Sequence, residues 1–228
     1  MQHLAIIPDG NRRWAMQNKL ESIFGHQRGM ETVKSAIKVC IKNSIQYLSF
    51  YTFSLENFRR SNHEKNYLFS LITNGTQNEL ADLIKHGVRI RFIGNRLLFP
   101  ESIQQTIQTI EKKTEHLNTL NLNLLFCYGA KSEIVHAAKL LAHQVKNGIL
   151  NVEDIDEEKV HGSLWTAGMP DPDLIIRTGG VVRLSNFLLF QAAYSELSFL
   201  DCHWPEITEE KLEGCIQEFK STQRNFGH

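Results

Sequence analysis

Polar and charged residues follow three apolar runs of this chain, at the points where those runs end. Residues 4–7 are followed by Asp9, Asn11, Arg12 and Arg13. Residues 47–53 are followed by Ser54, Glu56, Asn57, Arg59 and Arg60. Residues 174–176 are followed by Arg177, Thr178, Gly179, Gly180, Arg183 and Ser185. Guanidinium groups match the geometry of phosphate oxygens, and arginines beside a Gly-Gly turn suit a phosphate or diphosphate ligand. A carboxylate beside a phosphate needs a divalent cation between them, and Mg²⁺ binds in that way. The three groups therefore predict a diphosphate site with a metal ion.

The three groups can meet only if the apolar runs are strands of one sheet. The expected strands are residues 4–7, 47–53, 88–93, 120–128 and 174–176, with a short apolar segment at 199–200. The expected helices are residues 26–42, 67–85, 102–116, 133–146, 154–164 and 209–219. Strands that alternate with helices predict an α/β fold with a mostly parallel sheet, whose ligands bind beyond the carboxyl ends of the strands. No repeat or linker divides the chain, so we expect one domain over residues 1–228.

Composition excludes several other classes of protein. The 228 residues carry 25 basic and 25 acidic side chains, without the basic excess of a nucleic-acid-binding protein. The four cysteines form no C-x-x-C pair, which favours buried thiols in a reducing cytoplasm. The amino terminus does not resemble a signal peptide, and the apolar runs are far shorter than the ~20 residues of a membrane span. We expect a cytoplasmic protein that binds no nucleic acid, and peripheral contact with the membrane stays open.

The motifs resemble those of the cis-prenyltransferases, the undecaprenyl diphosphate synthase family, in its bacterial form. The resemblance rests on residues 3–15, 24–29, 51–60 and 171–197 and on Trp204-Pro205, which occur in the family's order and span nearly the whole chain. It implies a single α/β domain with a six-stranded, largely parallel sheet flanked by helices, and usually a homodimer. It also implies an apolar tunnel, for which Phe50, Phe53, Leu68, Leu71 and Leu83 could supply walls, although most of these are expected to be ordinary core residues.

The resemblance implies repeated condensation of isopentenyl diphosphate, in cis, onto an allylic diphosphate such as farnesyl diphosphate. The expected product is undecaprenyl diphosphate, the carrier lipid of cell-wall synthesis. Two alternatives stay open: a different product length, and a non-catalytic subunit of the same fold that supports a catalytic partner. Such subunits typically lack the aspartate of the first motif, whereas Asp9 is present here.

Residue roles carry over from the matching motifs. The resemblance implies that Asp9 and Asn57 are catalytic and that Asp9 and Glu196 bind Mg²⁺. The implied substrate-binding residues are Gly10, Asn11, Arg12, Arg13, Trp14, His26, Ser54, Glu56, Phe58, Arg60, Arg177, Arg183 and Ser185, of which Arg177, Arg183 and Ser185 hold the isopentenyl diphosphate. The proton acceptor stays open between His26 and the released pyrophosphate, because the Asn57 amide is no base at ordinary pH. Near the end of the chain, Arg224 resembles a family residue that can reach the partner subunit.

The chain departs from the family pattern at several positions. Ser22 stands where many members have a diphosphate-binding arginine, and Phe58 replaces a tryptophan. Val181 and Val182 follow the Gly-Gly turn where the family usually has an acid and a polar residue. The missing acid would leave Asp9 and Glu196 to meet the Mg²⁺ requirement alone.

Overall fold

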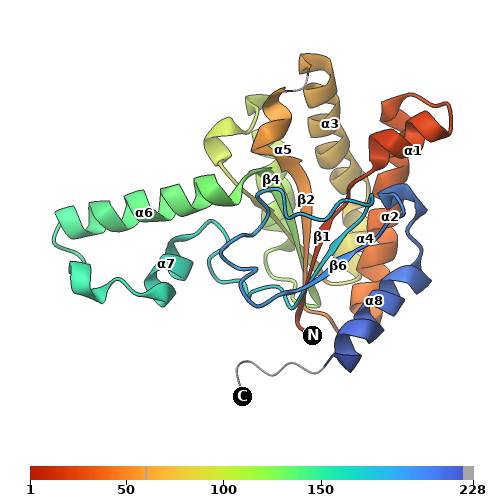
Figure 1. The fold of residues 1–228 in the computed structure, drawn as a ribbon. Helices are drawn as coiled ribbons and strands as arrows, with labels where there is room; N and C mark the ends of the chain where they lie inside the picture. Colours follow the sequence, from red (N-terminus) through yellow and green to blue (C-terminus); the bar gives the residue numbers. More distant parts are fainter. Residues whose placement is uncertain (60, 223–228) are drawn as a thin grey trace.

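A parallel sheet forms the centre of the computed structural model (Figure 1). The structure describes residues 1–59 and 61–222, apart from the side chain of Ser102, so Arg60 and Arg224 lie outside the described residues. The strands are β1 (His3–Ile7), β2 (Tyr47–Ser54), β3 (Val88–Ile93), β4 (Leu120–Tyr128), β5 (Leu174–Arg177) and β6 (Glu196–Phe199). They lie in the order β3-β4-β2-β1-β5-β6, with parallel pairing between all neighbours. The predicted six-stranded α/β fold is confirmed.

The helices differ from the expected ones at their ends, and the helix over residues 11–17 was not among those expected. They are α1 (Asn11–Gln17), α2 (Ser22–Lys42), α3 (Asn62–Asn78), α4 (Leu80–Lys85), α5 (Glu101–Thr114), α6 (Ala130–Lys146), α7 (Glu157–Ser163) and α8 (Glu209–Ser221). Short 3₁₀ turns are η1 (Leu55–Arg59), η2 (Arg96–Leu98), η3 (Val152–Asp154) and η4 (Trp204–Glu206). The prediction of a single helix over residues 67–85 was wrong, because the helix is interrupted at Glu79 and forms α3 and α4. The break follows Gly75 and Thr76, which are weak helix formers.

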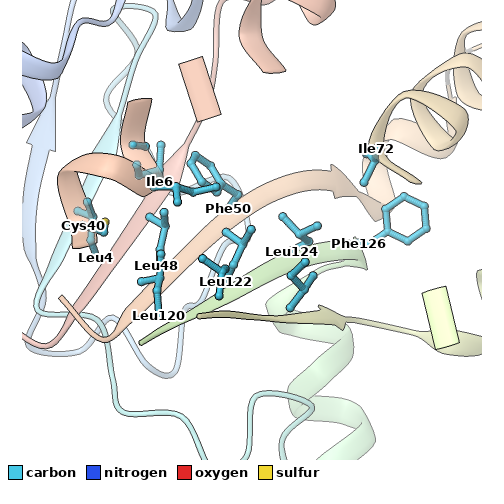
Figure 2. Close-up of a cluster of buried hydrophobic side chains, with 14 of the residues drawn as sticks. Leu4, Ile6, Cys40, Leu48, Phe50, Ile72, Leu120, Leu122, Leu124 and Phe126 are labelled. Atoms are coloured by element: carbon cyan, nitrogen blue, oxygen red, sulfur yellow. The ribbon is translucent and has the colours of Figure 1, made fainter. Parts of the chain in front are cut away.

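The two faces of the sheet are covered differently. Leu4, Ile6, Leu48, Phe50 and Leu122 point to one face and pack against apolar residues of α2, such as Cys40 (Figure 2). The other face buries a smaller cluster that includes Ile7, Leu125, Ile175 and Phe187. β1 and β5, each paired on both sides with another strand, are buried throughout, as their mostly apolar runs require.

Register places the three polar groups at one edge of the sheet. Ile6 lies opposite Phe50 of β2, and Ile7 lies opposite Arg177 of β5. Because all three strands run in the same direction, Asp9, the loop after Ser54 and the turn after Arg177 leave the sheet on the same side. None of the helices in the described part of the chain is long and apolar enough to cross a membrane.

Candidate active site

Asp9 and Arg177 form the centre of the polar cluster. Nη2 of Arg177 donates a hydrogen bond of 2.8 Å to Oδ2 of Asp9, while Oδ1 accepts from the backbone N–H of Gly10 at 2.7 Å. A second guanidinium lies close, since Nη2 of Arg13 is 3.3 Å from Oδ1 of Asp9. The Asp9 side chain keeps 32% of its surface exposed, whereas that of Arg177 keeps 5%. The Asp9 carboxylate therefore lies on the solvent-accessible side of the buried Arg177 guanidinium.

The surroundings of Asp9 hold its carboxyl group ionised. Burial by itself raises the pKa of Asp9, but the hydrogen bond and charge of Arg177, the charge of Arg13 and the N–H of Gly10 outweigh it. The net effect lowers the pKa of Asp9 below its ordinary value. A carboxylate that stays charged is a suitable oxygen ligand for a divalent cation.

The Gly-Gly turn after β5 fits closely against the first loop. Gly179 has a φ of 89° and Gly180 a φ of 65°, both in the left-handed region that glycine adopts readily. The carbonyl of Gly179 accepts a 2.6 Å hydrogen bond from Nη1 of Arg13, and a Cβ at Gly179 would overlap that guanidinium. Thr178 donates through Oγ1 to the Asp9 carbonyl at 2.7 Å. The turn therefore fixes both Arg13 and the backbone of Asp9.

Arg177 also organises the segment that follows the turn. Its Nη1 donates to the carbonyl of Arg183 at 2.5 Å and to Oγ of Ser185 at 2.7 Å. The exposed Arg183 reaches the same Oγ through Nε at 3.2 Å. Arg177, Arg183 and Ser185 are thus brought together as predicted.

The first two helices approach each other closely at Gly25 and Gly29, beside this cluster. Gly10 caps α1 with a φ of 102°, and Nδ2 of Asn11 donates to the carbonyl of Pro8 at 2.9 Å. A Cβ at Gly25 would overlap the Asn11 carbonyl, and one at Gly29 would overlap the Asn11 side chain. Gly29 in turn accepts a 2.8 Å hydrogen bond from the indole of buried Trp204. The two glycines of α2 therefore let α1 approach closely enough to place Arg12 and Arg13.

A polar cavity of about 620 Å³ opens over the first loop and these helices. Its lining includes Asp9, Gly10, Asn11, Arg12, Arg13, Ser22, His26, Tyr51, Thr52 and Asn57. Of the other predicted residues, Trp14, Ser54, Glu56, Phe58, Arg177, Arg183 and Ser185 are outside this lining. Asp9 thus separates two polar regions, the cavity over α1 and the Arg177–Ser185 cluster.

The loop after β2 contributes unequally to the cavity. Asn57 lines it, and Oδ1 of Asn57 accepts from the backbone N–H of Ser54 at 3.1 Å. Phe58 instead packs edge-to-face on Phe53, with ring centroids 5.2 Å apart, and lies partly buried against the apolar core. The role in substrate binding predicted for Phe58 therefore lacks support from its position.

An apolar cavity of about 460 Å³ adjoins the polar one. Its walls come from α2, α3, α4 and the covered face of the sheet, and include Met30, Val33, Ile37, Ile41, Phe50, Leu68, Leu71, Ile72, Leu83, Leu122 and Leu124. Pro8, Asn11, His26, Thr52 and Leu68 line both cavities. Of the predicted tunnel walls, Phe53 is absent from this lining, since it is fully buried among aromatic rings.

Glu196 lies far from Asp9 within one chain. Glu196 begins β6 opposite Leu174 of β5, which in turn lies opposite Leu4 of β1, at the amino end of these strands. Asp9, in contrast, follows the carboxyl end of β1. At about 3.3 Å per residue, this places Glu196 roughly 10 Å or more from the edge that carries Asp9. Among residues 1–59 and 61–222, no three His, Cys, Asp or Glu side chains gather as a metal-binding cluster. The structure does not bring the two predicted metal ligands together.

Some residues of the site were not assigned to it from the sequence. Thr178 is part of the polar group expected after residues 174–176, but its bond to the Asp9 carbonyl was not expected. The position of His203, whose ring would meet a Cβ at Gly10, was not expected either. Asn186 lies within the motif over residues 171–197, but its side-chain bonds to the first turn of α6 and to Glu56 depend on tertiary contacts. The motif's continuity from Arg183 through Asn186 is the signal that could have found it.

Comparisons with known proteins identify the family of this chain. The Prenyltransf family model, whose description names undecaprenyl diphosphate synthase, matches residues 7–227. The chain is 41% identical to a Thermoplasma acidophilum tritrans,polycis-undecaprenyl-diphosphate synthase named as geranylgeranyl-diphosphate specific, over 99% of this chain and 88% of that protein. It is also 41% identical to the Legionella pneumophila ditrans,polycis-undecaprenyl-diphosphate synthase named as (2E,6E)-farnesyl-diphosphate specific, over 99% of this chain and 95% of that one.

A solved structure matches along the whole chain as well. The lavandulyl diphosphate synthase from Lavandula x intermedia, crystallised in complex with dimethylallyl diphosphate, superposes with a TM-score of 0.96 at 31% identity. The match covers 100% of this chain and 98% of that one. The chain therefore belongs to the undecaprenyl diphosphate synthase family and is a prenyltransferase of the cis type.

Proposed function

We propose that this protein condenses isopentenyl diphosphate units, in cis, onto farnesyl diphosphate and so makes undecaprenyl diphosphate, the carrier lipid of cell-wall synthesis. The observation that carries the proposal is the adjacency of the two cavities. The polar cavity contains Asp9, Arg12 and Arg13, while the apolar cavity begins at the shared residues Asn11 and His26. A substrate with a charged diphosphate head and a growing hydrocarbon tail needs both environments, one for each end.

The charges of the site suit departure of a diphosphate group. Breaking the allylic C–O bond leaves its electron pair on the diphosphate oxygen, and the isopentenyl double bond forms the new C–C bond. The C2–H bond then breaks: its electrons form the new double bond, and its proton passes to a base, for which His26 and the released diphosphate are the candidates. In the proposed site Arg12, Arg13 and backbone N–H groups after β1 face the allylic diphosphate, and Arg183 with Ser185 faces the isopentenyl diphosphate. Preorganised donors of this kind stabilise developing charge most strongly where water is excluded.

The side chains around Asp9 fit Mg²⁺ when substrate and water complete its coordination. Mg²⁺ commonly keeps several waters and binds through one or two carboxylates together with phosphate oxygens. We assign that carboxylate to the ionised Asp9 and leave Glu196 out of the site, because register places it at the opposite end of the strands. Bound there, the ion would neutralise charge on the leaving diphosphate.

We also propose that the protein is a cytoplasmic homodimer that releases its product at the membrane surface. The α6–α7 region projects away from the sheet (Figure 1), and it exposes Val135, Leu140, Ile149 and Val152. An apolar surface that extends from the body of a protein is typical of an interface with another chain. The long hydrocarbon of the product gives the reason for peripheral membrane contact.

One experiment tests the activity and its specificity. The protein is incubated with labelled isopentenyl diphosphate, Mg²⁺ and, in separate reactions, dimethylallyl, farnesyl or geranylgeranyl diphosphate, and the products are resolved by chain length. We expect the C55 product from farnesyl diphosphate and no product in EDTA. Extension of geranylgeranyl diphosphate alone would show that this diphosphate, and not farnesyl diphosphate, is the allylic substrate. Shorter products would identify a cis-prenyltransferase with a different product length. Absence of any elongated product would favour the non-catalytic subunit.

A further inference from the structure

Asn186 joins three segments that are far apart in the sequence. Its backbone carbonyl accepts from the N–H of Ala130 at 2.9 Å, and its Oδ1 accepts from the N–H of Lys131 at 2.8 Å. Both donors belong to the first turn of α6, after β4. Its Nδ2 donates to Oε1 of Glu56, in the loop after β2, at 3.0 Å. One side chain therefore ties the isopentenyl-binding segment to two other loops at the carboxyl edge of the sheet.

The segment around Asn186 has an unusual backbone. Ser185, Asn186 and Leu188 have φ values of 51°, 67° and 43°, in the left-handed region that side chains other than glycine rarely adopt. A conformation of this kind persists only where surrounding contacts fix it, and such segments occur preferentially at functional sites. The bonds of Asn186 to α6 and to Glu56 are contacts of that kind, together with the bond from Arg177 to Ser185.

The neighbouring residues leave room for this arrangement. A Cβ at Gly129 would lie 2.8 Å from Nδ2 of Asn186 and 3.2 Å from Cδ1 of Leu55. The backbone of Gly129 is extended, with a φ of −169°, a conformation that any residue adopts. The glycine is therefore needed for the close approach of Asn186 and not for its own backbone angles.

The two ends of the Asn186 link are both next to residues assigned to the substrate. Ser185, directly before Asn186, accepts hydrogen bonds from both Arg177 and Arg183. Glu56, at the other end, directly precedes Asn57, which lines the polar cavity. Burial raises the pKa of Glu56, but the hydrogen bond from Asn186 and smaller contributions lower it overall, so Glu56 presents a carboxylate to the amide.

We propose that Asn186 is a positioning residue for isopentenyl diphosphate: it fixes Ser185 and Arg183 relative to the loop that carries Asn57. This inference rests on the proposed function. Asn186 does not touch the substrate in this assignment, and its effect passes through Ser185, Arg183 and Glu56.

A pair exchange between positions 186 and 56 tests the link. Asn186→Asp retains Oδ1 as the acceptor for α6 and tolerates the left-handed backbone, but it places a carboxylate against Glu56. We expect it to raise KM for isopentenyl diphosphate about tenfold or more, as loss of a hydrogen bond to a charged group does, with KM for farnesyl diphosphate nearly unchanged. Glu56→Gln alone keeps an oxygen that accepts from Asn186, so we expect it to raise KM for isopentenyl diphosphate less than Asn186→Asp does, and it is the reference for the double variant. In the double variant the glutamine amide at position 56 can donate to the carboxylate at position 186, so we expect KM to return to within about threefold of wild type.

The controls separate positioning from folding and from the activity itself. Gly129→Ala disturbs the Asn186 amide without changing either partner, and it should raise the same KM selectively. Thermal unfolding identifies any variant that fails to fold, and Glu56→Ala, at an exposed position, then removes the same bond and should raise that KM. Unchanged KM in Asn186→Asp, or a double variant no better than that single variant, would overturn the inference. A wild-type protein that forms no product would instead refute the proposed function.

Discussion

Asp9 and Arg177 differ in burial, and this difference predicts how substitutions at Asp9 should behave. Asp9→Asn keeps an oxygen that can accept from Arg177, whereas Asp9→Ala leaves a buried guanidinium without that partner. We expect both variants to lose at least about a hundredfold in kcat, because each removes the carboxylate assigned to Mg²⁺, the ion that would neutralise charge on the leaving diphosphate. Asp9→Ala should also lose about 1–3 kcal/mol of unfolding free energy, and Asp9→Asn less. Initial rates measure the loss in kcat, and thermal unfolding measures the loss in stability. An Asp9→Asn variant with a kcat close to that of wild type would refute the role of the carboxylate.

Arg177 and Arg183 also differ in burial, so we expect their substitution by alanine to have different effects on stability. Arg183 is exposed, so Arg183→Ala should raise KM for isopentenyl diphosphate about ten- to a hundredfold with no loss of stability. Arg177 is buried and bonds to Asp9, to the Arg183 carbonyl and to Ser185, so Arg177→Ala should lower both kcat and stability. Steady-state kinetics with each diphosphate varied, together with urea unfolding, distinguish the two outcomes. Equal stability losses in both variants would contradict this difference in burial.

At the scale of elements, the contact between α1 and α2 depends on glycines that leave no room for a Cβ. Alanine within a helix is ordinarily about 1 kcal/mol more favourable than glycine. At Gly25 the Cβ would overlap the Asn11 carbonyl, so we expect Gly25→Ala to destabilise the protein by about 1–3 kcal/mol and to lower activity through displaced arginines. The matched control is Gly214→Ala in α8, where a Cβ meets nothing within 4 Å and stability should rise. Equal effects of the two substitutions on unfolding would show that α1 adapts without cost.

His3 connects β1 to its neighbours at the opposite end of the sheet. Its Nδ1 is 2.7 Å from the carbonyl of Pro170 and its Nε2 is 2.7 Å from Oγ of Ser49. Burial lowers the pKa of His3 from 6.5 to about 4, despite smaller opposing effects from Pro170, Asp173 and Asp171.

This shift predicts the pH dependence of stability. Above pH 6.5 His3 is neutral in both folded and unfolded chains; between pH 6.5 and about 4 only the unfolded chain takes up the proton. Stability should therefore fall as the pH is lowered through this range, by about 3 kcal/mol from His3 alone. Urea unfolding at a series of pH values measures the slope, which should be shallower in His3→Gln and unchanged in a variant of the exposed His116, His116→Gln. An identical slope in His3→Gln would exclude this histidine as the cause.

At the scale of the whole molecule, the projecting α6–α7 region predicts the assembly. Ile149, with 73% of its surface exposed, and Leu140 lie on this region, and a charge at either position would be buried unpaired in a dimer interface. We expect the wild-type protein to have the mass of a dimer by light scattering. The double variant Leu140→Asp, Ile149→Asp should have the mass of a monomer. Leu97→Asp, at an exposed apolar residue of η2, is the control and should remain dimeric. A dimer that persists in the double variant would move the interface elsewhere.

The sequence by itself determined the strand and helix alternation, the parallel sheet and the identity of most residues at its carboxyl edge. These follow from local patterns, since apolar runs, turn residues and motif spacing are all short-range. It also predicted that Arg177, Arg183 and Ser185 act together. Only the tertiary structure decided which residues meet. Register separates Glu196 from Asp9, and Phe58 packs on Phe53 and does not line the cavity. Long-range hydrogen bonds join Thr178 to Asp9 and Asn186 to Glu56. Those outcomes depend on pairing and burial between distant segments, and residue type and spacing do not specify these contacts.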